Sequence, residues 1–172
     1  MGVSIHGDGS YRGQMGATLT VRAGITLAAD QESVWNLLVD WRRQREWILA
    51  TRAQGGHGTG ATVTARTGLG PIGFTDEMVI TQWEPPYRCS VAHVGKLVRG
   101  SGEFEVLPHA GGWQVRDASE LRWTERVELP FPRGLGRLVG AALIGPLARA
   151  GLAWSLRRFA RLAVHGRAPQ SA

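Results

Sequence analysis

The 172-residue sequence contains one cysteine, Cys89, and one lysine, Lys96. A single thiol excludes an intramolecular disulfide and a zinc site made of several cysteines. This favours a reducing compartment, and we expect a cytoplasmic protein. Residues 1–16 are polar and rich in glycine, without the apolar centre of a signal peptide. The apolar stretch 138–148 is shorter than the roughly 20 residues that cross a bilayer.

Motifs for metal or nucleotide chemistry are also lacking. The five histidines form no HExxH pattern, and no serine lies in a GxSxG pattern. Gly68–Gly73 matches GxGxxG, but Pro71 lies inside it and strand-like sequence follows where a nucleotide-binding motif requires a helix. These residues therefore predict a hairpin loop, and we expect neither a metal nor a cofactor.

Acidic residues are absent from 129–172, which carries seven arginines. The net charge of +6 therefore resides in this segment, and the rest of the chain is nearly neutral. Three interpretations are open: a solvated helix face, contact with an anionic membrane surface, or binding to RNA or a ribosome. No RNA-binding motif supports the last, so nucleic acid is the least favoured partner. The sequence leaves monomer and homodimer open.

The apolar pattern predicts the order of secondary structure. Thr18–Ile25 alternates as a strand, and Asp30 is placed to cap a helix with Val34, Leu37 and Leu38 on its inner face. A second short helix is expected over Trp41–Ile48. Gln54–Gly60 is expected to be a glycine-rich turn. Further strands are predicted at Ala61–Thr67, Phe74–Trp83, Tyr87–Val94, Leu97–Leu107, Trp113–Arg116 and Leu121–Leu129.

Short connections indicate an antiparallel sheet, because parallel crossovers need a dozen or more residues. Arg133–His165 carries one apolar stripe and predicts a long helix, interrupted near Pro146. Such a helix is the one element long enough to cover a face of the sheet. We expect an α+β fold with a flexible lead (1–17), one domain (18–165) and a flexible tail (166–172).

Four segments, ADQESVWNLLVDW, VITQWEPPYRCSV, LRWTERVELPF and SLRRFARLA, resemble the SRPBCC superfamily. The similarity is greatest to bacterial members described as polyketide cyclase/dehydrase and lipid transport proteins. The resemblance implies a helix-grip fold: a curved antiparallel sheet of six to seven strands, two short helices after the first strand, and a long C-terminal helix over a cavity. It implies a hydrophobic ligand such as a polyketide or lipid. The superfamily has no common catalytic set, so the resemblance assigns no catalytic residue.

Three polar residues on predicted strands are candidates for acid–base chemistry. Glu125 shares a strand face with Trp123 and Val127, His93 shares one with Cys89 and Val91, and Asp76 shares one with Met78 and Ile80. A carboxylate or imidazole in an apolar cavity can move protons in an aldol cyclisation or dehydration. The alternatives are structural: an ion pair of Glu125 with Arg99 or Arg66, and a hydrogen-bonded histidine at a strand end. For residues 74–83, Val79 and Trp83 argue for the opposite inner face.

The chain has seven tryptophans, more than plain core packing requires, and some are expected to line the cavity. Cys89 is interpreted as a small buried apolar residue. The predicted ligand-binding residues are Trp41, Met78, Ile80, Cys89, Val91, Phe104, Trp123 and Trp154.

Three functions follow from these observations. The first is binding of a hydrophobic small molecule, the second is a cyclase/dehydratase that uses a cavity acid and base, and the third is an interaction protein that uses the basic C-terminal helix. The sequence leaves open whether a reaction is catalysed.

Overall fold

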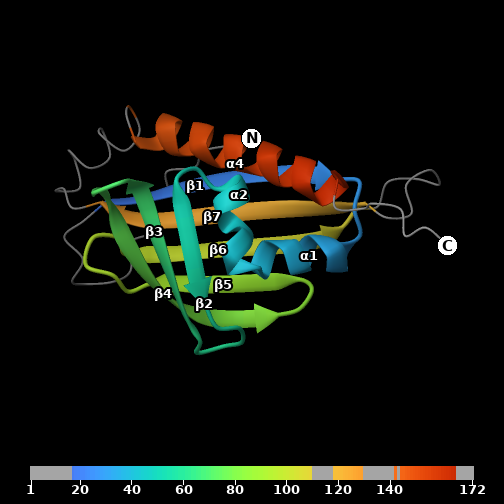
Figure 1. Ribbon diagram of the computed structural model, residues 1–172, viewed down its shortest axis with the longest axis horizontal. Helices are drawn as coiled ribbons and strands as arrows, with labels where there is room; N and C mark the ends of the chain where they lie inside the picture. Colours follow the sequence, from blue (N-terminus) through green and yellow to red (C-terminus); the bar gives the residue numbers. More distant parts are fainter. Residues whose placement is uncertain (1–16, 110–117, 130–141, 143, 166–172) are drawn as a thin grey trace.

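A computed structural model describes residues 17–109, 118–129, 142 and 144–165. It contains one antiparallel sheet of seven strands in the order β1-β7-β6-β5-β4-β3-β2 (Figure 1). The strands are β1 (Ala17–Leu27), β2 (Thr51–Gly55), β3 (Thr62–Leu69), β4 (Ile72–Glu84), β5 (Arg88–His93), β6 (Gly100–Pro108) and β7 (Ser119–Leu129). The helices are α1 (Gln31–Val39), η1 (Trp41–Arg43), α2 (Gln44–Trp47) and α4 (Gly145–His165). The α+β helix-grip fold predicted from the sequence is therefore confirmed.

The helices cover one face of the curved sheet, and α4 runs along β1 (Figure 1). Leu156 and Phe159 of α4 are buried together with Trp47 of α2, and they belong to one core cluster with the inner side chains of the sheet. The predicted helix cap is also present, because the Asp30 carboxylate accepts a hydrogen bond from the Ser33 backbone N–H at 2.7 Å. No helix within the described ranges is long and apolar enough to span a membrane.

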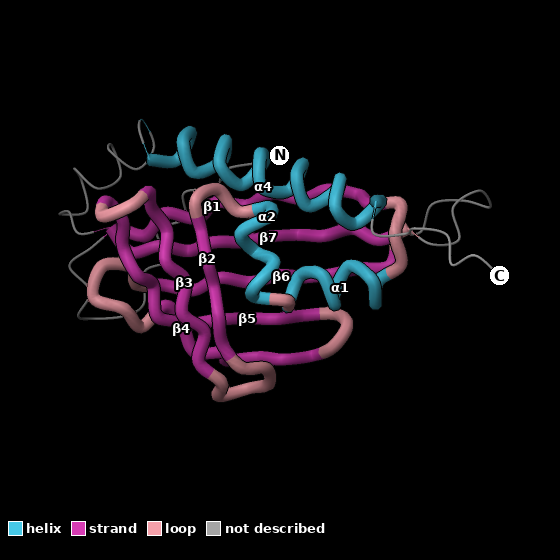
Figure 2. Tube along the Cα trace, in the orientation of Figure 1, coloured by secondary structure: helices cyan, strands magenta, loops and turns pink. Residues whose placement is uncertain are grey.

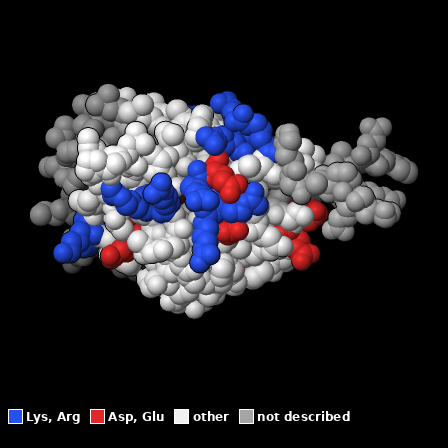
Figure 3. All heavy atoms as spheres, in the orientation of Figure 1, with Lys and Arg blue, Asp and Glu red and all other residues white. Residues whose placement is uncertain are grey.

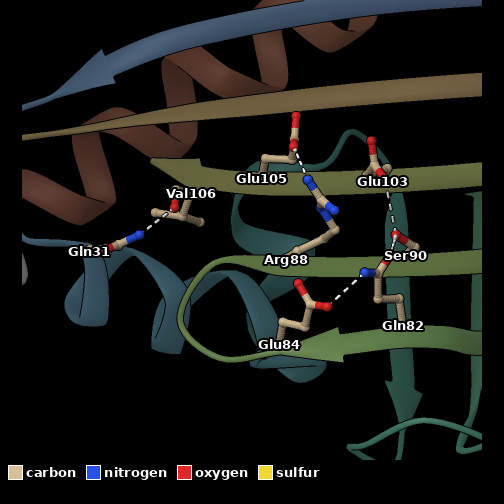
Figure 4. Close-up of polar contacts among 8 residues, drawn as sticks. All are labelled: Gln31, Gln82, Glu84, Arg88, Ser90, Glu103, Glu105 and Val106. Carbon is tan, nitrogen blue, oxygen red and sulfur yellow. Dashed lines mark hydrogen bonds and ion pairs between the residues drawn. The ribbon is translucent and has the colours of Figure 1, made fainter. Parts of the chain in front are cut away.

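The opposite face of the sheet is polar. Figure 4 shows the Arg88 guanidinium directed at Glu105 across β5 and β6, with the two groups 2.7 Å apart. The Ser90 hydroxyl donates to Glu103 at 3.2 Å, and the Gln82 amide donates to Glu84 at 2.8 Å. The sheet therefore has one apolar face covered by the helices and one polar face, as is common for antiparallel sheets.

A bulge in β4 determines which of its side chains face the helices. The pairing of β4 with β5 shifts between Ile80 and Gln82, which changes the alternation of side chains at that point. Asp76, Met78 and Ile80 therefore face inward before the bulge, and Trp83 packs against the same core after it. The sequence signal from Trp83 is therefore correct after the bulge, whereas Val79 lies before it, between Met78 and Ile80, and faces the other side.

Some boundaries differ from the prediction. Strand β2 (Thr51–Gly55) was not predicted, because only two of its five side chains are buried and the apolar alternation is weak. It overlaps the turn expected at Gln54–Gly60. Strand β6 begins at Gly100, so Leu97–Arg99 lies in a loop rather than in the predicted strand. Pro146 is the second residue of α4, as expected for a proline at a helix start. The predicted strand Trp113–Arg116, the helical residues 133–141, and the lead and tail (apart from Ala17, which begins β1) lie outside the described residues.

One end of the sheet brings several connections together, and we call it the hairpin end. The β3–β4 turn (Gly70–Pro71), the β5–β6 loop (94–99), the start of β1 and the end of β7 all lie there, because neighbouring strands alternate in direction. Figure 2 shows the two connections and the start of α4 at this same end, on the left of the view. The sequence prediction of a hairpin at Gly68–Gly73 is confirmed.

Candidate functional site: a buried Asp–His–Glu network

Three side chains from three strands meet on the covered face of the sheet near its hairpin end. The His93 Nδ1 lies 2.7 Å from Asp76 Oδ2, and its Nε2 lies 3.2 Å from Glu125 Oε2. Asp76 belongs to β4, His93 is the last residue of β5, and Glu125 belongs to β7. The imidazole therefore connects two carboxylates, and we call these three residues the network.

Strand β6 lies between His93 and Glu125, and its glycines make their contact possible. In the sheet, Gly100 is the register partner of His93, and Gly102 is the partner of Glu125. A Cβ atom at Gly102 would lie 2.9 Å from Glu125 Oε1 and 3.2 Å from Val91 Cγ2. The missing side chain therefore leaves the space through which the histidine and the glutamate approach each other.

Glu125 has a second fixed partner. The indole N–H of Trp123 donates to Glu125 Oε1 at 2.6 Å, while Oε2 faces His93. Both carboxylate oxygens are thus held in place. Asp76 differs, because its Oδ1 is buried and has no hydrogen-bond partner in the part of the chain that is described. That oxygen is an unused acceptor next to the network.

The surroundings of the network are apolar and aromatic. The side chains of His93, Asp76 and Glu125 are only 7%, 12% and 19% exposed. The rings of Phe104 and Trp123 lie 5.0 Å apart, and both pack edge-on against Trp47. Three charged groups inside such surroundings are costly to bury unless they pair with one another.

Pairing within the network changes the charge of His93. Burial lowers the pKa of this imidazole, but the hydrogen bonds to Asp76 and Glu125 outweigh it and raise the pKa from 6.5 to about 9. At neutral pH the ring is therefore a cation that donates from both nitrogens. One imidazolium between two carboxylates gives the network one formal excess negative charge.

This pKa makes stability depend on pH in a defined direction. A raised pKa means that the folded state binds the proton more tightly than the unfolded state, so the stabilisation is fully present below pH 6.5 and is lost as the pH rises to about 9. We expect His93 to titrate near pH 9 by NMR of its ring protons, and the free energy of unfolding to fall between these pH values. In a His93→Gln variant this fall should disappear, whereas in a His57→Gln variant it should remain. A ring that titrates near pH 6.5 would contradict the expectation.

The three candidate acid–base residues are thus brought together by the fold. Glu125 contacts His93 and Trp123, while the Arg66 guanidinium donates to the Gly70 carbonyl. Whether the three residues act in catalysis stays a prediction.

The predicted ligand-binding residues divide into three groups. Met78, Val91 and Phe104 are partly buried against the core, and Trp123 is 7% exposed beside Glu125. Ile80 and Cys89 are fully buried, and burial raises the pKa of the Cys89 thiol to about 12, which keeps it protonated. A protonated buried thiol is not a nucleophile, in agreement with the apolar role that the sequence indicated.

The two remaining predicted tryptophans differ in their surroundings. Trp41 is 5% exposed and belongs to the main core cluster. Its indole N–H donates to the Gly56 carbonyl at 2.8 Å, and its ring stacks on His57 beside a surface hollow between η1 and β2. Trp154 lies beneath the Arg158 guanidinium, 4.9 Å from the ring centre, and is not among the residues that pack on the main core cluster.

Sequence reasoning missed two contributors to the site. Gly102 is a glycine in the interior of a strand, a signal that often marks a close approach by another group. Trp47 lies in the short helix predicted over Trp41–Ile48, and its ring is fully buried between Phe104, Trp123 and Phe159. Its indole N–H has no partner among the described residues.

No group of His, Cys, Asp and Glu in the described ranges could hold a metal ion.

No curated protein sequence matches the chain.

Solved structures with the same fold have low sequence identity. A Staphylococcus aureus protein of unknown function, SA2116, is 9% identical with a TM-score of 0.71, covering 88% of this chain and 96% of its own. Norcoclaurine synthase from Thalictrum flavum, in complex with a transition-state analogue, is 12% identical with a TM-score of 0.60, over 89% and 98% of the two chains. DynU16, from the dynemicin biosynthetic locus, is 20% identical with a TM-score of 0.60, over 86% of this chain and 48% of its own.

At these identities the structures show the fold alone, whereas a family model covers nearly all of the ordered domain. That model matches residues 18–164, from the first strand to the end of α4. The chain therefore belongs to the family described as polyketide cyclase/dehydrase and lipid transport.

Proposed function

We propose that this protein binds a hydrophobic small molecule between α4 and the covered face of the sheet, and that the network recognises a polar group of that molecule. The observation that carries the proposal is the set of three ionisable side chains, Asp76, His93 and Glu125, buried among aromatic and aliphatic groups. Buried ionic groups contribute little to stability compared with apolar packing, so a cluster of them on a covered face favours a functional role.

The chemistry of the network indicates the class of ligand. Phe104, Trp123 and Met78 offer flat and aliphatic surfaces that suit a ring system or an acyl chain. Asp76 Oδ1 is an acceptor without a partner in the described chain, and the network carries excess negative charge. A ligand with a hydroxyl donor, such as a phenol or an enol, complements these groups better than a carboxylate does. The family description is consistent with a polyketide.

A variant that fills the site tests this proposal. Val91 lies on the covered face beside Gly102, whereas Val94, three residues later, is 55% exposed. We expect Val91→Phe to reduce ligand binding by about tenfold or more, because the larger side chain occupies the space of the ligand. Val94→Phe should leave binding unchanged.

The measurement is native mass spectrometry of the protein after incubation with an extract of its host, followed by titration with the compound that is retained. Retention by the wild type and by Val94→Phe, but not by Val91→Phe, is the expected result. Equal retention by all three proteins would place the ligand elsewhere, and no retained compound in any of them would contradict the binding function.

A second candidate function is a cyclase/dehydratase, and the contact between an imidazolium and a carboxylate favours it. We propose that Glu125 accepts a proton from the acidic carbon between two carbonyls of a poly-β-ketone. The resulting enolate carbon forms a bond to a second carbonyl carbon, and His93 donates a proton to the oxygen of that carbonyl. Glu125 then returns its proton to the new hydroxyl, which departs as water, while the neutral His93 takes the remaining proton from the attacking carbon; the double bond forms and both groups return to their starting states. The two groups lie 3.2 Å apart, close enough for one reacting molecule to contact both.

A further inference from the structure

Exposed apolar side chains are concentrated at the hairpin end of the sheet. Among the residues that the structure describes, nine large hydrophobic side chains are exposed, and seven of them belong to segments that meet at this end. They are Leu49, Leu69, Ile72, Phe74, Val94, Leu97 and Leu147. The other two, Tyr87 and Val164, lie in the β4–β5 turn at the other end and near the C-terminal end of α4. Exposed hydrophobic residues that occur singly need no explanation, but a group of this kind marks an interaction site.

Contacts between the segments confirm that they are neighbours. Leu69 and Ile72 pair with each other at the end of the β3–β4 hairpin, and the Gly68 N–H donates to the Ala50 carbonyl next to Leu49 at 2.9 Å. The Val94 N–H donates to the Glu77 carbonyl at 2.8 Å, which joins the β5–β6 loop to β4. The first turn of α4 packs through Ala148 on Leu19 and Leu129, the ends of β1 and β7. These segments therefore lie around one end of the sheet, where Figure 2 shows the β3–β4 turn, the β5–β6 loop and the start of α4.

The aliphatic side chains of this surface project separately into solvent. Ile72, Leu69, Leu97 and Leu147 are 80%, 78%, 77% and 74% exposed. The hairpin tip is closed by Gly70, with φ of 57°, and Pro71, a two-residue turn that holds Leu69 and Ile72 side by side. Separate aliphatic tips can enter a soft apolar medium together, whereas a rigid protein partner would need a matching pocket for each.

The charges beside these tips are mainly basic. Residues 66–75 and 94–101 contain Arg66, Lys96 and Arg99 and no acidic residue. The nearest acids are Glu77 of β4 and Glu128 of β7, whose N–H donates to the Arg99 carbonyl at 2.9 Å. Figure 3 shows Lys and Arg side chains and a smaller acidic group over this end of the molecule. Basic side chains next to aliphatic tips complement the phosphates of anionic lipids above the hydrocarbon of a bilayer.

From this arrangement we infer that the hairpin end docks on a membrane surface that contains anionic lipid, with the aliphatic tips entering the bilayer. The network lies at the same end: His93 ends β5 just before the β5–β6 loop, and a Cβ atom at Gly95 in that loop would lie 3.8 Å from Asp76 Oδ1. A docked molecule would therefore present the end of its covered face to the bilayer, where hydrophobic compounds dissolve. The docking itself does not depend on the proposed ligand, and it can be measured without one.

Co-sedimentation with vesicles tests the inference. The probes are vesicles of phosphatidylcholine alone and vesicles of phosphatidylcholine mixed with phosphatidylglycerol. We expect the wild type to bind the mixed vesicles more strongly. A Leu69→Ser/Ile72→Ser variant should lower the partition coefficient by about tenfold or more, since two large aliphatic side chains no longer leave water. Lys96→Gln should lower binding to mixed vesicles by about fivefold, the effect of one basic residue near such a surface.

Two controls separate this surface from others. Tyr87→Ser removes an exposed apolar side chain at the opposite end, and Arg157→Gln removes a charge from the exposed side of α4. Both should bind vesicles like the wild type. Since Leu69 and Ile72 are largely exposed, their serine variant should retain its far-ultraviolet circular dichroism and its ligand retention, which separates failed docking from failed ligand binding.

Three outcomes would overturn the inference. The first is equal vesicle binding by the wild type and the Leu69→Ser/Ile72→Ser variant. The second is loss of binding only in Arg157→Gln, which would assign the contact to α4. The third is a wild type that does not bind vesicles but forms a dimer in analytical ultracentrifugation, whereas the serine variant stays monomeric. That result would make the hairpin end a contact between copies of the chain.

Discussion

Replacing His93 by leucine is expected to lower the free energy of unfolding by about 3–5 kcal/mol at neutral pH. The imidazolium is the cation that Asp76 and Glu125 share, with contacts of 2.7 and 3.2 Å. Leucine fills a similar volume but leaves two carboxylates on the covered face without a positive partner. Urea denaturation of the variant and the wild type measures the difference.

The pH dependence of this loss identifies its origin. The wild-type imidazolium loses its proton as the pH rises to about 9, so the stability difference between the wild type and His93→Leu should shrink over this range. His57→Leu is the matched control, because His57 is an exposed histidine that contacts the Val39 carbonyl outside the network. A difference between His93→Leu and wild type that does not change with pH would show that lost packing, not unpaired charge, is the cause.

A triple variant distinguishes stability from function. Changing Asp76→Leu and Glu125→Gln in the His93→Leu background removes both carboxylates, and the Glu125→Gln change keeps an amide oxygen that can accept from the Trp123 N–H. Apolar replacement of a complete buried ionic cluster is often neutral or stabilising. Recovery of stability together with loss of ligand retention would therefore show that the network serves binding rather than folding.

Glu125→Gln is expected to lower turnover by about 10²- to 10⁴-fold if the protein cyclises a poly-β-ketone, the range for removal of a general acid or base. The amide retains the shape of the side chain and an oxygen that can accept from Trp123, but it cannot take a proton from carbon. Ligand retention should therefore be largely preserved while the chemical step is lost. The measurement is single-turnover conversion of a panel of linear poly-β-ketone thioesters, followed by mass spectrometry.

Glu103→Gln is the matched control for this prediction. Glu103 lies on the neighbouring strand β6 but points to the opposite face, where it accepts a hydrogen bond from Ser90 (Figure 4). Conversion should be unchanged in this variant. Equal conversion by Glu125→Gln and the wild type would remove Glu125 from the reaction, and no conversion by the wild type would leave binding as the function.

Norcoclaurine synthase and DynU16, at 12% and 20% identity, share an architecture with the chain. Function on such a scaffold depends on which side chains line the covered face. The Asp76–His93–Glu125 arrangement is therefore the feature on which a specific activity is to be tested.

The sequence by itself determined the architecture. Alternation in Leu121–Leu129 and the apolar stripe of the last helix predict an antiparallel sheet under a long helix, because each pattern follows directly from the geometry of a strand or a helix. The position of Asp30 before Val34 predicts the helix cap for the same local reason. The alternation of side chains along the predicted strands also identified Asp76, His93 and Glu125 as polar residues on apolar faces.

Only the tertiary structure decided that these three residues meet. His93 and Glu125 are 32 residues apart in the sequence, and their contact depends on Gly102 in the intervening strand. The inward direction of Asp76 together with Trp83 depends on the bulge between Ile80 and Gln82, and a shift of one residue would have reversed either side chain. Register, bulges and the space left by a glycine arise from pairing between strands, so local patterns along one strand do not contain them.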